Sequence, residues 1–578
     1  MLGVGHDSRT GSDHHRHQQH RQQEHQHVEA LIIQLRRWLT AVIICFVLVT
    51  SSSVLSWSRP IELAPTQSAA NQSCDVLRYG AMGSGADDTD ALQAVLDNEL
   101  CAEVVLPSGS TLRATELFVR RDNIVLVIER NATLAGLPVA FRATRPDCAT
   151  ETGLEFNWTT WCALIRVTSS TNFTLRGAGR LAPGGVGGAS PDFYSALHVQ
   201  STSRVALSGV RVHCTAWWWC VAMHNATDVV VSDGFFLDGR AGRDGIDFVN
   251  CRRVLVENAR IEGSDDALCF KTISNGGLSR HPSRDVVVRH VLIGSTWCNG
   301  VQFGSATEVD MHNFSFHNVR VRFARKAAIS IVSMDGANIS AISFRNVSIE
   351  GKDVATPLYI KVGHRADCED GKGTCGRAGS IRDINLTDIR AVGWGNVRHA
   401  KPGHRRSYTA TIEGLDGGLH SVGALRLSSL TLVAPGGGDA ADARREPLVA
   451  PLSSYQPRFD GVRPSYGLFL RHARDVTLED STFSVAEEAH DGRPAIVLDD
   501  VHGVTLSHVS FPVPRAVTGA PTTVSLSGTF DGVGARPPLC RAIEARNTSG
   551  VKWRAEGSGA WQQPCAWVPH APDRGDSK

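Results

Sequence analysis

The chain has 578 residues, and its 59 Lys and Arg residues nearly balance its 58 Asp and Glu residues. This balance argues against a strongly basic nucleic-acid-binding protein, so no nucleic acid partner is expected. Gly is abundant at 55 residues, and Val is frequent, as expected of many short strands joined by tight turns.

The N-terminal segment differs in composition from the rest of the chain. Residues 1–37 are polar and His-rich, which predicts a disordered cytoplasmic leader. Residues 38–57 are mostly apolar and follow Arg36 and Arg37, which predicts a single-pass signal anchor. A cleaved signal peptide is the alternative. Either segment would send the remainder into the secretory pathway, as a membrane-anchored protein with an extracellular or luminal domain or as a secreted one.

Cysteine and sequon content supports that compartment. There are 14 Cys residues and ten Asn-x-Ser/Thr sequons, which favour disulfides and glycosylation. Several Cys lie close in sequence, and none has the paired spacing of a zinc site. The close pairs are Cys148 and Cys162, Cys214 and Cys220, Cys368 and Cys375, and Cys540 and Cys565. Their connectivity stays open, because spacing alone does not determine it.

The segment from Asp87 to Asp97 predicts a short helix. Acidic residues begin it, and Leu92, Val95 and Leu96 fall on one face. Such a helix would cap the N-terminal end of a strand-rich domain and cover its open edge.

A short repeat dominates the rest of the sequence. Each copy has a polar residue, alternating apolar positions, a small or polar corner and a second apolar pair. Copies begin at Asn172, Ser203, Asp228, Arg253, Asp285, Asn313, Ala341, Asp383, Asp475 and Gly503. Those from Asp228 to Ala341 are 25 to 32 residues apart. Two short strands around a corner at this period predict one coil of a parallel β-helix, which buries its inward residues against neighbouring coils. A β-sandwich, the alternative, would favour hairpin turns such as Asn-Gly, which are scarce.

The period sets the expected domain boundaries. We expect an all-β chain with a parallel β-helix over residues 72–515 and a short N-terminal capping helix. Residues 394–465 interrupt the period with Gly- and Pro-rich sequence and predict irregular loops at one rim. Residues 516–578 are less periodic and predict a C-terminal cap.

Three carboxylates give the sharpest chemical signal. Asp244 lies 21 residues before the adjacent Asp265 and Asp266 begin, close to one coil, and residues one coil apart stack about 4.8 Å apart. Mutual repulsion should raise the pKa of at least one of them. One protonated acid and one ionised base are what glycoside hydrolysis needs. The alternative is that these Asp residues only cap corners, which a third Asp one coil away and the nearby Lys271 make less attractive.

With these residues the chain resembles glycoside hydrolase family 28, the polygalacturonase family of the pectin-lyase-like β-helix superfamily, in its divergent branch. The resemblance runs from about Cys74 to about Phe511 and includes Tyr79-Gly-Ala-Met-Gly-Ser-Gly-Ala-Asp-Asp-Thr-Asp, Asp244-Gly-Ile-Asp and Ser264-Asp-Asp-Ala-Leu-Cys-Phe-Lys. It implies a right-handed parallel β-helix that hydrolyses glycosidic bonds in a pectin-like, galacturonic-acid-containing polysaccharide with inversion.

The resemblance also implies roles for the carboxylates. Asp265 would be the general acid, while Asp244 and Asp266 would hold and deprotonate the attacking water. Inversion would leave roughly 6.5–9.5 Å between acid and base. No metal or other cofactor is implied, and a monomer is expected.

Two positions depart from the family's pattern. Asn299 replaces the family's His, and Ala328-Ile-Ser stands where the family has an Arg-Ile-Lys that grips the substrate carboxylate. Arg325 and Lys326, just upstream, are candidates to replace that cation, and a solvated corner is the alternative for Lys326. A branched pectic chain or a neutral glycan is therefore also a candidate substrate.

Other polar residues end or follow strands on successive coils. The predicted substrate-binding residues are Asn299, Lys271, Gln302, Lys361, His364 and Arg365. Asp335 and His224 are further candidates to contact substrate. For all of these residues, the alternative is a structural role at a rim or corner of the solenoid. The run Trp217-Trp-Trp219 is expected to stack on sugar rings or to pack in the core. Cys251 and Cys269 are expected to be buried or disulfide-bonded, without a nucleophilic role.

Two other functions stay open. A calcium-dependent, pectate-lyase-like eliminase would use the acidic cluster to bind Ca²⁺. A catalytically inactive glycan-binding β-helix protein would keep the fold without the chemistry, although a binder has no need of three mutually repelling carboxylates.

Overall fold

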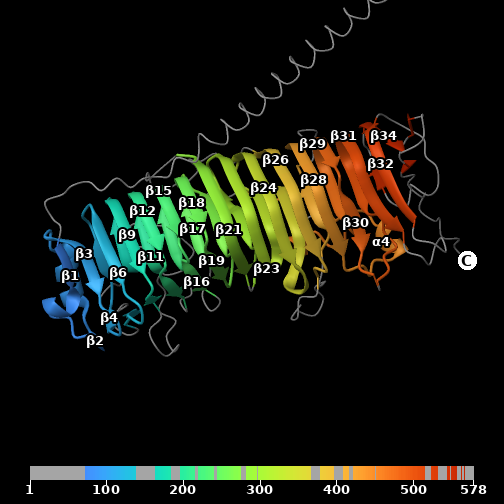
Figure 1. The fold of residues 1–578 in the computed structure, drawn as a ribbon. Coiled ribbons are helices and arrows are strands. Elements are labelled where there is room, and N and C mark those ends of the chain that lie inside the picture. The colour runs from blue at the N-terminus through green and yellow to red at the C-terminus, as the bar shows by residue number, and fades with distance from the viewer. Residues whose placement is uncertain are drawn as a thin grey trace, which may run out of the picture. The chain divides into compact units, whose positions relative to one another are not determined.

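The protein is a right-handed parallel β-helix, as the sequence predicted. In Figure 1 its strands follow one another along the solenoid in chain order, from β1 to β34. The computed structural model describes residues 72–137, 163–183, 195–214, 219–239, 244–274, 281–295, 297–365, 378–395, 408–415, 421–448, 451–487, 489–513, 522–530, 543–546, 549–555, 561–562 and 565–566. The predicted leader (1–37) and signal anchor (38–57) lie outside these residues. Within the described part, no helix is long and apolar enough to cross a membrane.

Each coil contributes to three parallel faces, and the longer strands extend over more than one of them. Face 1 comprises β5 (Leu117–Val119), β8 (Ala163–Thr168), β11 (Ser195–Gln200), β14 (Val221–His224), β17 (Ile246–Val249), β20 (Leu268–Thr272), β22 (Val301–Thr307), the end of β23 (Met311–Ser333), β25 (Val354–Val362), β27 (Ala410–Glu413) and the beginnings of β29 (Leu468–Glu479) and β31 (Ile496–Val513).

Faces 2 and 3 complete the coils. Face 2 comprises β1 (Gln72–Asp75), β3 (Cys101–Leu106), β6 (Ile124–Ile128), β9 (Thr171–Gly177), β12 (Ser203–Ser208), β15 (Thr227–Ser232), β18 (Arg252–Glu257), β21 (Ser283–Ser295), β23, β24 (Asn338–Glu350), β26 (Ser380–Val392), β28 (Val422–Ala434), β29 and β31. Face 3 comprises β2 (Ser84–Asp87), β4 (Thr111–Ala114), β7 (Thr133–Gly136), β10 (Arg180–Ala182), β13 (Arg211–His213), β16 (Phe236–Gly239), β19 (Arg260–Gly263), the later parts of β21, β23, β24, β26 and β28, and β30 (Thr482–Val485).

Inward side chains of successive coils stack to form one continuous core. Phe248 lies over Phe270 with ring centroids 5.6 Å apart, and Phe316 lies over Phe344 at 4.2 Å. Phe270 also meets Phe316 edge to face at 5.9 Å. These rings are fully or almost fully buried, so the period in the sequence reflects residues that each coil can bury only against its neighbours.

Left-handed backbone conformations explain the polar position of each repeat. This position has a positive φ in copy after copy, including Asn172, Asp228, Asp285, Asn313, Asp383 and Asp475. Asn and Asp adopt this conformation more readily than other non-Gly residues. The Nδ2 of Asn313 also donates a hydrogen bond to Oδ1 of Asp285 at 2.8 Å, which links the corners of two coils.

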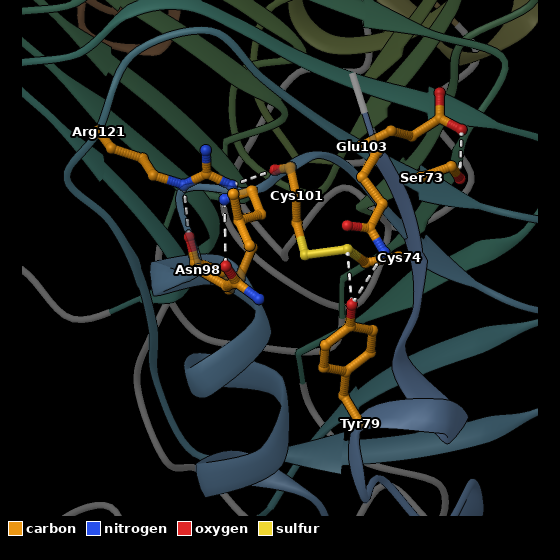
Figure 2. The surroundings of a disulfide bond; sticks show 10 residues. Ser73, Cys74, Tyr79, Asn98, Cys101, Glu103 and Arg121 are labelled. Atoms are coloured by element: carbon orange, nitrogen blue, oxygen red, sulfur yellow. Dashed lines mark hydrogen bonds between the residues drawn. A yellow bond between two sulfur atoms is a disulfide. The ribbon is translucent and has the colours of Figure 1, made fainter. Parts of the chain in front are cut away.

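A helix and a disulfide close the N-terminal end, as Figure 2 shows for the disulfide. The apolar face of α2 (Thr89–Asp97) is buried, as predicted. Cys74 and Cys101 are disulfide-bonded and join β1 to β3. Arg121 donates to the carbonyl oxygen of Leu96 at 2.7 Å and to that of Cys101, so its guanidinium ties the helix to the first coils.

Of the four Cys pairs that lie close in sequence, one can be assigned. Cys214 and Cys220 form a disulfide. Each of the other three pairs contains at least one residue outside the described part of the chain.

The stretch 394–465 is regular in part. Strands β27 and β28 lie in it and continue faces 1 and 2, pairing with β25 and β26. The remainder includes α4 (Ala440–Arg444) and the 3₁₀ helix η5 (Pro457–Phe459). Residues 451–465 fold back over the outward side of face 1, where Asp460 accepts a hydrogen bond from Lys361 at 3.1 Å.

Strand pairing becomes mixed after β31, with both parallel and antiparallel pairs. The strand β32 (Thr522–Phe530) runs antiparallel to β31 and to β34 (Ser549–Ala555). The chain continues through β33 (Ile543–Arg546), which is parallel to β31, and β35 (Trp561–Gln562) to β36 (Cys565–Ala566). This region coincides with the predicted C-terminal cap.

Replacing Phe316 by Ala should lower the free energy of unfolding by about 3–5 kcal/mol, because the ring leaves a cavity between coils that cannot fully collapse. Arg322→Ala, in the exposed part of the same strand, is the matched control and should change it by less than about 0.5 kcal/mol. Chemical denaturation followed by circular dichroism measures both. Similar losses in the two variants would contradict the inward stacking.

Candidate active site

Face 1 brings the three predicted carboxylates together. Asp244 directly precedes the segment that leads into β17, and Asp265 and Asp266 precede β20 in the next coil. The register pairs Ile246 with Leu268, so Asp244 lies beside Asp266. The main-chain N–H of Asp266 donates to Oδ1 of Asp244 at 3.2 Å. Asp265 stands one position earlier, at the edge of the same cluster.

The close approach of the two coils requires glycine after Asp244. A Cβ on Gly245 would lie 2.3 Å from the carbonyl oxygen of Ala267. The N–H of Gly245 instead donates to the carbonyl oxygen of Asp266 at 2.8 Å. The Asp-Gly sequence therefore sets the distance between the two carboxylate-bearing segments.

Lys271 is the buried cation of the cluster. Its Nζ donates to Oδ2 of Asp244 at 2.9 Å and to Oδ1 of Asp247. It also lies 4.1 Å from the ring centroid of Trp219. Burial by itself lowers the pKa of Lys271, but Asp244 and Asp247 outweigh it and hold that pKa well above the usual value. Lys271 is therefore charged and keeps Asp244 as its ion-pair partner.

Asp266 carries the most informative electrostatic perturbation. Burial, followed by the charges of Asp244 and Asp265, raises the pKa of Asp266 to about 7. Its Oδ1 accepts hydrogen bonds from the backbone N–H of Asn299 at 3.0 Å and from Nδ2 of Asn299 at 2.8 Å. The Oδ1 of Asn299 accepts from the N–H of Ala327 at 3.0 Å. Asn299, a predicted substrate-binding residue, thus orients Asp266 toward the cluster.

A second cation lies beside the Asp265–Asp266 pair. The carboxylates of Asp265 and Asp266 and the thiol of Cys298 have atoms within 4.8 Å of one another. Burial lowers the pKa of Lys326, but Cys298 and the two carboxylates outweigh it and raise that pKa. Lys326 therefore remains charged next to the pair, where the sequence had made it a candidate cation.

An exposed aromatic residue flanks the same position. Trp297 precedes Cys298 and is 60% exposed. The guanidinium carbon of Arg325 lies 4.3 Å from the centroid of its ring. Sequence reasoning did not single out Trp297, and its exposure beside partly buried carboxylates makes it a candidate sugar-contacting residue.

Asp247 is the other residue that sequence reasoning missed. It is fully buried and pairs with Lys271. The Asp244-Gly-Ile-Asp segment contained it, but alternation along a strand does not reveal which carboxylate has a buried counter-ion.

Two groups of acidic and thiol side chains have atoms close enough to hold a metal ion. The first is Asp244, Asp247 and Cys269, and the second is Asp265, Asp266 and Cys298. In the first group Lys271 already binds all three side chains, with Sγ of Cys269 at 3.0 Å from Nζ. We therefore conclude that the ammonium of Lys271 occupies the position of a cation in this first group.

The remaining predicted substrate-binding residues contact protein groups. Gln302 is buried in face 1 beside Cys269, and its Nε2 donates to the carbonyl oxygen of Phe303 at 2.9 Å. Lys361 is buried and pairs with Asp460 at 3.1 Å. It lies three coils from Asp266, a separation of roughly 14 Å along the solenoid axis at the usual strand spacing.

His364 and Arg365 follow the same strand as Lys361. The backbone N–H of His364 donates to the carbonyl oxygen of Leu452 at 2.9 Å. Arg365 Nε donates to Oδ1 of Asp335 at 2.6 Å, and Asp335 also accepts from the N–H of Thr307 at 2.8 Å. The structure therefore places Lys361, His364 and Arg365 against residues 451–465 and Asp335, apart from the carboxylate cluster.

Histidine and tryptophan side chains lie on the preceding coils. His198 Nε2 and His224 Nδ1 are 2.8 Å apart, and the Trp219 and His224 rings stack at 6.3 Å. Burial lowers the pKa of His198 to about 3 and that of His224 well below the usual value, so both rings are neutral. Trp217 and Trp218 lie outside the described residues.

Cys251 and Cys269 are buried free thiols, in line with one of the two expectations for them. Burial raises the pKa of Cys251 to about 12 and that of Cys269 well above its usual value. Neither is a thiolate, so neither is a nucleophile.

Several solved structures are similar to the chain at low sequence identity. No protein-family model and no curated protein matches the chain. An exopolygalacturonase from Thermotoga maritima is 14% identical, with 79% of this chain and 94% of that chain covered and a TM-score of 0.49. A family 28 exopolygalacturonase from Yersinia enterocolitica is 15% identical, with 83% and 78% covered and a TM-score of 0.48. The surface adhesin PfbA of Streptococcus pneumoniae is 12% identical, with 85% and 98% covered and a TM-score of 0.41. At such low identity, these likenesses concern the fold alone.

Replacing Asp266 by Asn should make stability less dependent on pH. Folding raises the pKa of Asp266 from about 3.9 to about 7, so between these values the folded state holds a proton that the unfolded state has released. The free energy of unfolding therefore falls as pH rises through this window. Asn does not titrate, so the variant lacks this decrease.

Melting temperatures of the parent and the Asp266→Asn variant, measured from about pH 4 to pH 8, test this prediction. The range spans the unfolded and folded pKa values of Asp266. The melting temperature of Asp266→Asn should rise relative to that of the parent as pH rises, and the difference should become constant above about pH 7. The exposed corner variant Asp383→Asn should run parallel to the parent. A constant offset for Asp266→Asn would show that Asp266 ionises normally.

Proposed function

We propose that the protein is an inverting glycoside hydrolase that cleaves glycosidic bonds in a pectin-like, galacturonic-acid-containing polysaccharide. The observation that carries this proposal is the cluster of Asp244, Asp265 and Asp266, in which one carboxylate is paired with a buried Lys and another has a pKa of about 7. Hydrolysis of a glycosidic bond needs one protonated and one ionised carboxyl group at the same bond.

The roles follow from the partners of each carboxylate. Asp244 pairs with Lys271 at 2.9 Å and faces Asp266 across one coil, so these two would hold the attacking water. A base with a pKa near 7 removes a proton more effectively than an ordinary carboxylate. Asp265, at the outer edge of the cluster, would protonate the leaving oxygen.

Asp265 and Asp266 would share one proton in the active form. Because the two groups repel each other as anions, the proton belongs to the pair and can reside on either member. The reactive arrangement has it on Asp265, with Asp266 ionised.

The cations beside the pair support an acidic substrate. Lys326 interacts with Asp265 and Asp266, and Arg325 stacks on the exposed Trp297. An aromatic face suits the apolar face of a sugar ring, and a guanidinium or ammonium suits its carboxylate. In our proposal these residues take over the grip that the Arg-Ile-Lys of the family supplies, and Asn299 supports Asp266 in place of the family's His.

The disulfides support a secretory-pathway location for the described domain. Bonds such as Cys74–Cys101 and Cys214–Cys220 persist in oxidising compartments. A polysaccharide outside the cell is the substrate that such a location makes available.

Replacing Asp265 by Asn should abolish hydrolysis, lowering the rate at least about 100-fold because a general acid is lost. The protein from about residue 60 onward, expressed under oxidising conditions, would be incubated with homogalacturonan, branched pectins and neutral glycans, and new reducing ends would be measured. Asp383→Asn, at an exposed corner, is the matched control and should retain full activity.

Three outcomes would overturn parts of this proposal. Equal release by the parent and Asp265→Asn would exclude Asp265 as the acid. Unsaturated products that need Ca²⁺ would indicate an eliminase. Binding without release by the parent would indicate an inactive glycan-binding protein.

A further inference from the structure

A polar concavity lies on face 2, whereas the carboxylates lie on face 1. Its volume is about 380 Å³. Its lining includes His317 of β23, Ser343 and Arg345 of β24, Thr387 of β26, and Arg426 and Ser428 of β28. We refer to it as the face 2 groove.

The register arranges the groove in two outward rows. One row runs from Ser343 through Asn385 to Arg426. The other runs from His317 through Arg345 and Thr387 to Ser428. Neighbouring members of a row are about 4.8 Å apart, so the groove offers a polar side chain at every coil in each row.

The groove is electropositive. None of its lining residues is acidic. Arg345 is exposed and forms no ion pair within the described part of the chain, while Arg426 shares its charge with Glu479 at 3.0 Å. Burial, and then the charges of Arg345 and Arg289, lower the pKa of His317, which reports the same positive field. An anion placed here would meet two guanidinium groups.

The floor of the groove carries neutral hydrogen-bonding groups. Thr387 Oγ1 donates to Oδ1 of Asn385 at 2.9 Å and lies 3.0 Å from Oγ of Ser428. Hydroxyl and amide groups of this kind recognise polyhydroxylated ligands.

We propose that the face 2 groove binds a uronate residue of an acidic polysaccharide, as a site separate from the one that cleaves the bond. Arg345 and Arg426 would pair with carboxylates, since a guanidinium forms two parallel hydrogen bonds with that group. Thr387 and Ser428 would bind ring hydroxyls. The site would hold the polymer on the solenoid, and it would serve an inactive glycan-binding protein equally well.

Isothermal titration of the chain carrying Asp265→Asn with an oligogalacturonate of defined length tests this proposal, because that variant should leave the probe intact. Adding Arg345→Ala and Arg426→Ala should remove one bound oligosaccharide per chain, or weaken binding at that site at least about tenfold. Adding Arg390→Ala, an exposed arginine of β26 outside the groove, should change neither quantity.

The probe arms separate the sources of recognition. A neutral galactose oligosaccharide of the same length should not bind at the groove. If it binds equally well, or if the double arginine variant titrates like the Arg390→Ala control, the proposal is wrong. If inorganic sulfate at equal concentration displaces the oligogalacturonate, the groove recognises isolated anions and the glycan assignment fails.

Discussion

The parallel hydrogen bonding of each coil on the next is the constraint on which the candidate site depends. It places Ile246 on Leu268 and so sets Asp244 beside Asp266, although the two are separated by most of a coil along the chain. The same stacking brings Lys271 under both Asp244 and Asp247 and brings Asn299 to Asp266. A coil longer or shorter by one residue at this point would reverse which side chains face outward, and the cluster would be lost.

Burying charge beside this stack has an electrostatic cost that the protein offsets only in part. Lys271 compensates Asp244 and Asp247, and a buried cation with two carboxylates is stable only because each is hydrogen-bonded. Even so, burial and the charge of Asp244 raise the pKa of Asp247 well above its usual value, and burial with the charges of Asp244 and Asp265 raises the pKa of Asp266 to about 7. A fold selected for stability alone would not place a carboxylate there, and perturbed groups of this kind concentrate at functional sites. The outward residues of face 2 do not have this electrostatic cost, because Arg345 and the hydroxyls around it remain accessible to water.

Sequence reasoning predicted the fold well because each repeat in the sequence corresponds to one coil, with its buried strands and its corners. Alternating apolar residues mark strands, and Asp228 or Asn313 marks a left-handed corner. The proximity of Asp244 to Asp266 followed from a spacing near one coil. What the pattern could not show is that residues 451–465 return over face 1, so that Lys361 faces Asp460 and not the cluster. The Cys74–Cys101 bond was missed for a related reason, because its partners are neighbours across coils and far apart in sequence.

The stereochemistry of cleavage tests the central claim most directly. Proton NMR of the first product formed from an oligogalacturonate, recorded before the anomers equilibrate, shows which anomer the protein releases. Direct attack by a water held between Asp244 and Asp266 predicts the anomer opposite to that of the cleaved bond. Release of the same anomer would require a covalent intermediate on one of these carboxylates. It would contradict direct attack by a water that Asp244 and Asp266 hold.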